Sequence, residues 1–428
     1  MKKLFIYLLL LVSMFLVSCG ASKALDGDPS SSPREPGDHY AYEIGPSIAD
    51  SYLPSPEAGG YKTSEGDAYE GWDDVSTGEE KPNEEYPQAG QLTASVVFDN
   101  DNYNFWKTLI TRGQEAGLFY GDSLKYPFDS TNRIKITVPK INNAKVSINN
   151  KYYGITDSNG VVYLFPEKAD SYDLSIVYTD NNGKKFTYND KIEGDFTLEN
   201  PVEQLKTKEK MQILFVVDTT GSMGDEIRYL KSELKDVINT IKQDLGNIQI
   251  EIGFVFYRDY GDQYVTDVSD FSTNIDSKQK DLDKQYADGG GDWEEAVQEA
   301  FIQANKLDWD MEAKSRLIVW VADAPCHDKD ADTVKEQTNK FCEKGIRVIT
   351  VASSGIDKCT EYLFRSICIA TNGCYGYLTN DSGIGYEHTE ATTEEKPVVE
   401  YLNKMLIRLI KGFYTGEFEE PVAWRGQE

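Results

Sequence analysis

The pattern of apolar and polar positions changes twice along the chain. Up to about residue 91, beyond a short apolar run at the start, the sequence is rich in Ser, Pro, Gly, Asp and Glu. Such a segment cannot bury enough apolar surface to offset its chain entropy. From residue 134 apolar and polar residues alternate in short runs, and from residue 210 longer apolar runs alternate with helical periodicity. The pattern predicts a disordered tether, a small antiparallel domain and a larger α/β domain.

The last region has the pattern of a doubly wound α/β domain. Residues 213–217 (ILFVV) are continuously apolar, as in a parallel strand that is buried on both faces. The helix predicted after this strand has one apolar face, marked by Ile227, Leu230 and Leu234. Further buried strands are predicted at 250–256, 317–322 and 348–352, alternating with helices at 294–306 and 333–344. A mostly parallel sheet with helices on both faces holds its ligand beyond the carboxyl ends of its strands.

The middle region has the pattern of an antiparallel β-sandwich. Short alternating runs between residues 134 and 178 are separated by turn sequences such as 158–160 (SNG). Residues 156–161 (TDSNGV), followed by 164–166 (LFP), resemble the carboxypeptidase-regulatory-like, transthyretin-like sandwich of exported proteins. We interpret this domain as a structural spacer. Trp106 and Leu109 stand at helical spacing before it and predict a helix that packs onto one of the domains.

The start of the chain has the pattern of a bacterial export signal. Lys2 and Lys3 precede an apolar run at 4–17, which is too short to span a bilayer comfortably. Residues 16–19 (LVSC) resemble the lipobox of bacterial lipoproteins, in which Cys19 is acylated and becomes the mature N-terminus. The resemblance implies a lipid anchor in the cell envelope, and the absence of an acidic residue just after Cys19 favours the outer membrane. The alternative is an ordinary signal peptide with a chance cysteine.

The net charge limits the class of partner that we expect, and the positions of the cysteines limit the disulfides. The net charge of −28 argues against nucleic acid, whose phosphates the chain would repel. Apart from Cys19, five cysteines lie between residues 326 and 374, without any C-x-x-C spacing. We predict a disulfide between Cys326 and Cys359, because each follows a predicted parallel strand and the two loops meet at one sheet edge. Five thiols without a disulfide are the alternative.

The residues that follow the first predicted strand point to a metal ion. Asp218, Thr220 and Ser222 alternate in the sequence 218–224 (DTTGSMG), so a strand-to-turn bend aims their oxygens at one point. Oxygen donors of this kind suit Mg²⁺ or Ca²⁺ rather than a soft metal. A plain helix cap is the alternative interpretation. The motif resembles the metal-ion-dependent adhesion site of von Willebrand factor A (VWA) domains.

Two further acidic loops stand where that resemblance requires them. Residues 289–297 (GGGDWEEAV) occupy the place where many VWA domains supply a threonine to the metal, and here the threonine is missing. The resemblance then makes Asp292 the substitute, directly or through water. Residues 321–328 (VADAPCHD) are similar to the loop that carries the last acidic ligand, which implies a mostly water-mediated role for Asp323. A second carboxylate near the ion should weaken its attraction for a partner's acid.

The resemblance extends over about residues 210–413. Within this range the sequence is similar to the VWA branch linked to alpha-kinases and bacterial exported proteins. We divide the chain into a signal peptide (1–18), an acidic linker (19–91), a helical segment with the sandwich (92–205), a VWA domain (206–416) and a tail (417–428). The family implies one Mg²⁺, Ca²⁺ or Mn²⁺ ion and a protein partner that offers a carboxylate, without catalysis. The alternatives are an envelope protein with a vestigial metal site, or a hydrolase that uses Asp218, Glu295 and His327, for which no nucleophile and base pair is recognisable.

Overall fold

The computed structural model describes residues 87–424 except for residues 112–117 and Asp292. The predicted signal peptide, Cys19 and most of the predicted linker therefore lie outside the described residues. Within the described ranges, no helix is long and apolar enough to cross a membrane.

The large sheet has the mostly parallel arrangement that the apolar runs predict. Its strands lie in the order β11-β10-β9-β12-β13-β14-β1-β15, and the pairs from β10 to β14 are all parallel. The central strands are β9 (Lys208–Asp218), β10 (Gln249–Tyr257), β12 (Ala313–Ala322), β13 (Arg347–Ala352) and β14 (Cys374–Leu378). The antiparallel edges are β11 (Thr266–Ser272), β1 (Thr93–Val97) and β15 (Glu400–Tyr401). The predicted α/β fold class is confirmed.

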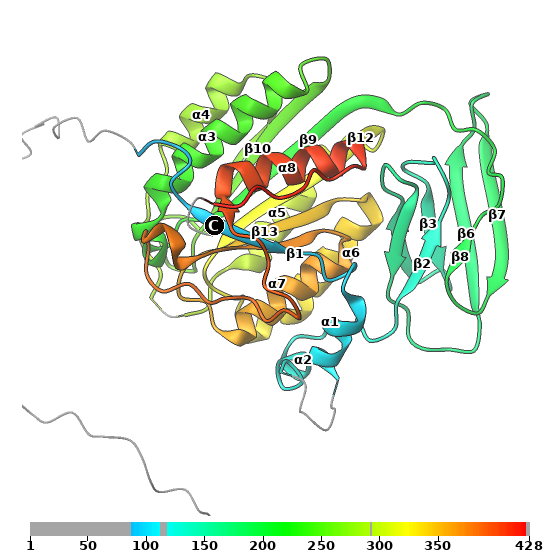
Figure 1. Ribbon diagram of the computed structural model, residues 1–428, viewed down its shortest axis with the longest axis horizontal. Helices are drawn as coiled ribbons and strands as arrows, with labels where there is room; N and C mark the ends of the chain where they lie inside the picture. Colours follow the sequence, from blue (N-terminus) through cyan, green and yellow to red (C-terminus); the bar gives the residue numbers. More distant parts are fainter. Residues whose placement is uncertain (1–86, 112–117, 292, 425–428) are drawn as a thin grey trace, which may run out of the picture. The chain divides into compact units, whose positions relative to one another are not determined.

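Helices cover both faces of this sheet (Figure 1). On one face lie α3 (Ile227–Asp244), α4 (Ile275–Asp283) and α8 (Leu402–Thr415); on the other lie α5 (Val297–Lys306), α6 (Ala331–Lys344) and α7 (Lys358–Ala370). Successive residues of β9 explain the two cores, because Leu214 and Val216 point into one while Phe215 and Val217 point into the other. The apolar run at 213–217 is thus explained by burial of β9 on both faces.

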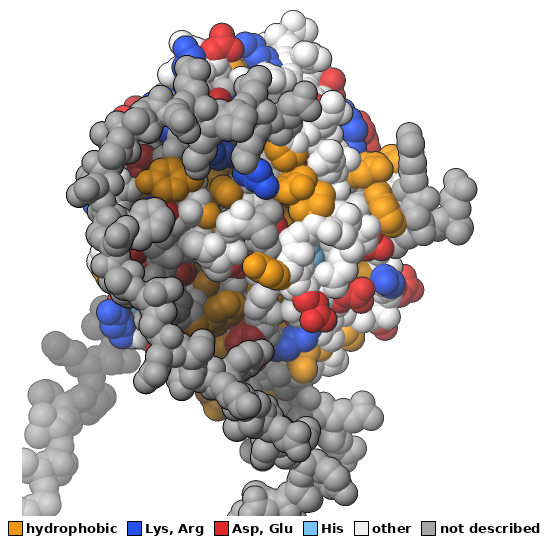
Figure 2. Space-filling view, turned by 90° about the vertical axis from the view of Figure 1, so that its left-hand side faces the viewer, with side chains coloured by type: hydrophobic (Ala, Val, Ile, Leu, Met, Phe, Trp, Pro, Cys, Tyr) orange, Lys and Arg blue, Asp and Glu red, His pale blue; other side chains and the backbone are white. Residues whose placement is uncertain are grey.

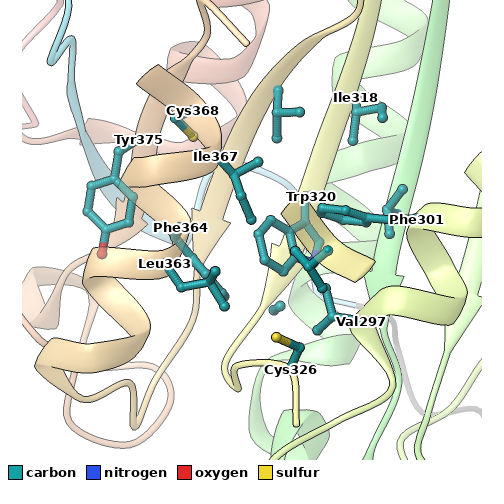
Figure 3. Close-up of a cluster of buried hydrophobic side chains, with 14 of the residues drawn as sticks. Val297, Phe301, Ile318, Trp320, Cys326, Leu363, Phe364, Ile367, Cys368 and Tyr375 are labelled. Carbon is teal, nitrogen blue, oxygen red and sulfur yellow. The ribbon is translucent and has the colours of Figure 1, made fainter. Parts of the chain in front are cut away.

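Trp320 of β12 lies in the core on the face of the sheet that α5, α6 and α7 cover, between α5 and α7 (Figure 3). Its ring lies 5.0 Å from Phe301 of α5 and 4.2 Å from Phe364 of α7, measured between ring centroids. The indole N–H donates to the Tyr257 hydroxyl at the end of β10, 3.1 Å away. Trp320 therefore joins both helices to the sheet close to the carboxyl ends of β10 and β12.

The chain contributes the strand β1 to this sheet before the smaller domain begins. β1 pairs with β14, and α1 (Tyr103–Ile110) then places Trp106 in a stack on Tyr362 of α7, with 6.0 Å between ring centroids. The short α2 (Asp122–Lys125) follows. The helix expected around Trp106 and Leu109 is therefore present, and it packs on the α/β core.

Two small sheets with a shared apolar core make up the middle region. One sheet has the order β5-β2-β8 and the other β4-β3-β6-β7. The strands are β2 (Ile134–Thr137), β3 (Lys145–Ile148), β4 (Tyr152–Ile155), β5 (Val161–Leu164), β6 (Tyr172–Thr179), β7 (Lys185–Ile192) and β8 (Phe196–Thr197). All pairs are antiparallel except β2 with β8. Asn142 and Asn143 donate to the backbone carbonyls of Lys314 and Ala313 at the start of β12, the edge opposite to the predicted ligand loops.

Candidate metal centre

The turn after β9 brings three of the predicted ligands together. One oxygen of Asp218, Oδ1, accepts hydrogen bonds from the Thr220 backbone N–H at 2.9 Å and from the Thr220 hydroxyl at 2.7 Å. The Thr220 hydroxyl also lies 3.2 Å from Oγ of Ser222. Asp218 and Thr220 are buried, whereas Ser222 is exposed at the start of a 3-10 turn, Gly221–Asp225. The three oxygens thus form a line from the sheet to the surface.

Asp323 joins this group from the neighbouring strand. It follows β12 by one residue, and β12 runs in parallel register beside β9 up to the pair Val321 and Val217. Asp323 is buried, and the Ser222 side chain is close enough to lower its pKa. Burial is the first cause that raises the pKa of Asp323 to about 8, and the Asp218 charge is the second. Two buried carboxyl groups therefore lie near each other at the ends of adjacent strands.

Glu295 is a third buried acid at the same edge, and the sequence points to it only in the hydrolase alternative. Its side chain is 3% exposed, and its backbone N–H donates to the carbonyl of Pro325 at 2.9 Å. Burial first, and then the charges of Asp218, Asp259 and Asp323, raise its pKa to about 10. Asp292, the substitute expected from the family pattern, lies outside the described residues.

Each of these three acids has one oxygen without a hydrogen-bond partner among the described residues. The oxygens are Oδ2 of Asp218, Oδ1 of Asp323 and Oε2 of Glu295. The Tyr257 hydroxyl is also close to Asp218 and lowers its pKa, although Oδ2 accepts no hydrogen bond from the described residues. An unpaired buried carboxylate oxygen is costly, and a bound cation offsets that cost.

Glycines hold the loop before Glu295 against the first motif. Gly289 accepts a hydrogen bond at its carbonyl from the Gly221 N–H, 3.1 Å away, and Gly290 donates to Oδ2 of Asp262 at 2.9 Å. Gly289 and Gly290 have φ values of 79° and 76°, which glycine adopts most easily. A Cβ on Gly289 would also overlap the Asp262 carboxylate. The Gly-rich sequence is therefore required by loop packing.

Two further acids around the site are already paired with histidines. Oε1 of Glu226 lies 2.7 Å from Nε2 of His388, and Oδ1 of Asp259 lies 2.7 Å from Nε2 of His327. Glu226 and His388 are both buried. His327, which the hydrolase alternative would use, is thus held by Asp259.

The donor set fits a hard divalent cation. Within the described ranges, no three or more His, Cys, Asp and Glu side chains are already arranged as a metal-binding group. The predicted site differs in kind, because two of its donors are the hydroxyls of Thr220 and Ser222. Carboxylate and hydroxyl oxygens with unpaired lone pairs are ligands that Mg²⁺, Ca²⁺ and Mn²⁺ accept.

The two cysteines of the predicted disulfide, Cys326 and Cys359, both lie near Tyr126. Cys326 and Cys359 are both free thiols, and both lie close enough to the buried Tyr126 hydroxyl to raise its pKa. Burial is the main cause that raises the pKa of each thiol to about 12. The disulfide between them stays a prediction.

Comparison with known proteins agrees with this fold. Residues 212–383 match the sequence model of the von Willebrand factor A domain, so the chain contains a VWA domain, as the motif resemblance predicts.

Two curated relatives share part of the chain. Over 119 residues the chain is 35% identical to a protein of Acanthamoeba polyphaga mimivirus described as ariadne-like with a RING finger, covering 28% of this chain and 11% of that protein. Over 235 residues it is 26% identical to the alpha-protein kinase vwkA of Dictyostelium discoideum, covering 51% of this chain and 37% of the kinase. The chain thus spans about a tenth of one relative and just over a third of the other. Among solved structures, the conserved hypothetical protein BatB from Bacteroides thetaiotaomicron matches 47% of this chain and 98% of its own, with 15% identity and a TM-score of 0.30.

Proposed function

We propose that this protein is a lipid-anchored protein of the bacterial cell envelope that binds a protein partner through one divalent ion in its VWA domain. Asp218, Thr220 and Ser222 would hold Mg²⁺, Ca²⁺ or Mn²⁺ directly, and Asp323 would hold it mainly through water. When bound, such an ion attracts an oxygen of the partner, for which we propose a carboxylate.

One observation supports the metal most strongly. Asp218 and Asp323 come from adjacent strands, both are buried, and each has an oxygen without a hydrogen-bond partner among the described residues. Two like charges in a site with little water repel each other, so the fold tolerates them only if a cation or protons offset the charge. The two hydroxyls beside Asp218 add donors that a structural ion pair would not need.

The surface around the site supports a protein partner. Figure 2 shows the side of the molecule toward which the carboxyl ends of the parallel strands point, with hydrophobic and acidic side chains exposed next to each other. Three exposed aromatic residues come from the loops between β10 and α5: Tyr260, Tyr286 and Trp293. Exposed aromatic side chains are common anchors of protein interfaces.

Two rival functions give different results in a binding experiment. An envelope protein with a vestigial site would bind no ion, and a metal-dependent hydrolase would consume a substrate. We favour binding because His327, the histidine that the hydrolase alternative would use, is already paired with Asp259.

Calorimetry on the full chain tests the metal. Cys19→Ser prevents acylation and keeps the protein soluble for the measurement. We expect one Mg²⁺ or Mn²⁺ per chain, and loss of that binding in Asp218→Ala. Asp308→Ala is the control, because Asp308 is exposed at the opposite edge of the sheet, where its carbonyl accepts from Gln212. Undiminished binding in Asp218→Ala would refute the site.

A capture experiment tests the partner. The immobilised full chain should retain an envelope protein in Mg²⁺, release it in EDTA, and retain nothing when Asp218 is replaced by Ala. A partner that binds equally well to all three preparations would rule out metal-dependent recognition.

A further inference from the structure

A cleft of about 370 Å³ lies between the smaller domain and the helices α6 and α7. One wall comes from β4 and β5, and the other comes from the two helices. The volume falls within the range of small-molecule sites, which is roughly 300–1,000 Å³. None of the residues that line this cleft belongs to the candidate metal centre, so the cleft is a separate candidate site.

Direct contacts hold the two walls of the cleft together. Asn372, which follows α7, accepts a hydrogen bond from the Tyr163 N–H of β5 at 2.7 Å and donates to the Tyr163 carbonyl at 3.1 Å. Arg347 of β13 donates to the carbonyl of Ile155 at the end of β4, 3.4 Å away. A Cβ on Gly345, just after α6, would lie 2.8 Å from Cβ of Ile155, so β4 packs directly on the backbone there. The cleft is therefore formed without a ligand, which lowers the entropic cost of binding.

Aromatic residues of the smaller domain line the cleft, and they are not fully covered. Tyr153 of β4 is 41% exposed, and Tyr152, Tyr163 and Phe165 are half-buried. Hydrogen bonds fix two of these rings. The Tyr153 hydroxyl donates to the carbonyl three residues before it at 2.6 Å, and the Tyr152 hydroxyl donates to Oε1 of Glu167 at 3.1 Å. The cleft therefore presents aromatic rings in fixed positions to an apolar surface of a ligand.

The polar groups of the cleft suit a neutral ligand that carries hydroxyl groups. The lining has three carboxylates, Asp129, Glu167 and Glu343, against two ammonium groups, Lys151 and Lys335, so its net charge is two minus three, or −1. Lys151 is already paired with Glu167, 2.6 Å away. A phosphate or an acidic group would meet more negative than positive charge, whereas a hydroxyl can donate to a carboxylate.

The wall of the cleft also contains a buried hydroxyl group, that of Ser366 of α7. Ser366 is 1% exposed, and its hydroxyl has no hydrogen-bond partner among the described residues. The hydroxyl of Tyr362, one turn earlier in α7, donates to the carbonyl of Phe128 at 3.0 Å. A buried hydroxyl without a partner is costly, and a polar ligand in the cleft would offset that cost.

We propose that this cleft binds a sugar ring of a neutral glycan. A sugar ring has an apolar face of C–H groups, which packs on aromatic rings such as that of Tyr153, and a rim of hydroxyl groups, which pair with the carboxylates and with Ser366. An apolar peptide side chain would leave those polar groups without a partner. This inference does not depend on the proposed metal site, and it gives the smaller domain a role in binding besides that of a spacer.

Sugar binding to the full chain with Cys19→Ser tests the proposal. Maltotriose, cellotriose and tri-N-acetylchitotriose are the probes, and EDTA is present so that metal ions do not contribute. Titrations followed by saturation-transfer difference NMR measure the affinity. We expect at least one of the three sugars to bind, with a dissociation constant on the order of 1 mM, as for a ligand of this size.

Substitutions on the two walls place the sugar in the cleft. Tyr153→Ala should weaken binding by at least about fivefold, because the sugar loses an aromatic contact. Tyr386→Ala is the matched control, since Tyr386 is 73% exposed in the segment that follows β14, and it should bind the sugar like the wild type. Thermal unfolding checks that each variant is folded. Glu343→Gln changes an exposed residue of α6 on the opposite wall, and it decides the question if Tyr153→Ala does not fold.

Two results would overturn the proposal. One is the absence of binding by all three sugars at concentrations up to about 20 mM. The other is binding that both Tyr153→Ala and Glu343→Gln leave unchanged. Because the titrations are made in EDTA, neither result bears on the proposed metal-dependent function, and a failure of metal binding would not affect this inference.

Discussion

Asp218→Asn should separate the stability of the fold from its capacity to bind metal. Asparagine has the same shape, keeps an oxygen that can accept from Thr220, and carries an amide where Oδ2 has no partner among the described residues. Burial, and less strongly the charge of Asp259, raise the pKa of Asp218 from 3.8 to about 6. In the metal-free protein the charged form is therefore disfavoured in the folded state.

The sign and size of the effect follow from this pKa. Because the pKa is higher in the folded than in the unfolded state, the stabilisation by the bound proton is complete below about pH 4 and is lost as the pH rises through about 6. At pH 8 the cost is about 3 kcal/mol, at about 1.4 kcal/mol per pKa unit. Asp218→Asn removes this cost, so its melting temperature without metal should be higher than that of the wild type by roughly 5–10 °C at pH 8 and similar at pH 4.

Thermal unfolding in EDTA and in excess Mg²⁺ measures both effects. The wild type should gain stability from Mg²⁺ at pH 8, since a ligand that binds only the folded state stabilises it, and Asp218→Asn should gain none. The reasoning is refuted if Asp218→Asn is less stable than the wild type in EDTA at pH 8, or if Mg²⁺ stabilises both proteins equally.

Three further predictions address other parts of the chain. Gly289→Ala should lower the unfolding free energy by about 1–3 kcal/mol and weaken Mn²⁺ binding, because φ at residue 289 is positive and a Cβ there would overlap the Asp262 carboxylate. Chemical denaturation and calorimetry measure the two effects, and unchanged values would contradict the prediction. Under oxidising conditions Cys326 and Cys359 should form a disulfide, detected by peptide mapping without reduction, and alkylation of Cys326 as a free thiol would count against it. Cys19→Ser should move the protein from the detergent phase to the aqueous phase in detergent partitioning, and unchanged partitioning would contradict the lipid anchor.

The fold could be predicted wherever burial on both faces leaves a continuous apolar run. The run at 213–217 became β9, and the predicted strands at 250–256, 317–322 and 348–352 became β10, β12 and β13. β1 was not predicted, because its five residues precede the smaller domain and their partner β14 is far along the chain. A fragment that began after the smaller domain would lack the strand between β14 and β15.

The site could be predicted where alternation within one turn aims side chains at one point. Asp218, Thr220 and Ser222 share such a turn, and Asp323 follows the neighbouring strand. The choice among the acids of residues 289–297 depends on where α5 begins and on the contact of Glu295 with Pro325, neither of which is a local pattern. Ala296 and Val297, both apolar, were the available signal that residue 295 stands at the buried start of the helix.

The most direct test of a metal ion at the carboxyl edge of the sheet is a crystal structure of the chain grown with Mn²⁺, with an anomalous difference map. We expect one anomalous peak in the VWA domain, surrounded by the oxygens of Asp218, Thr220 and Ser222. A map without a peak at this position, at a Mn²⁺ concentration that saturates the crystal, would contradict the account.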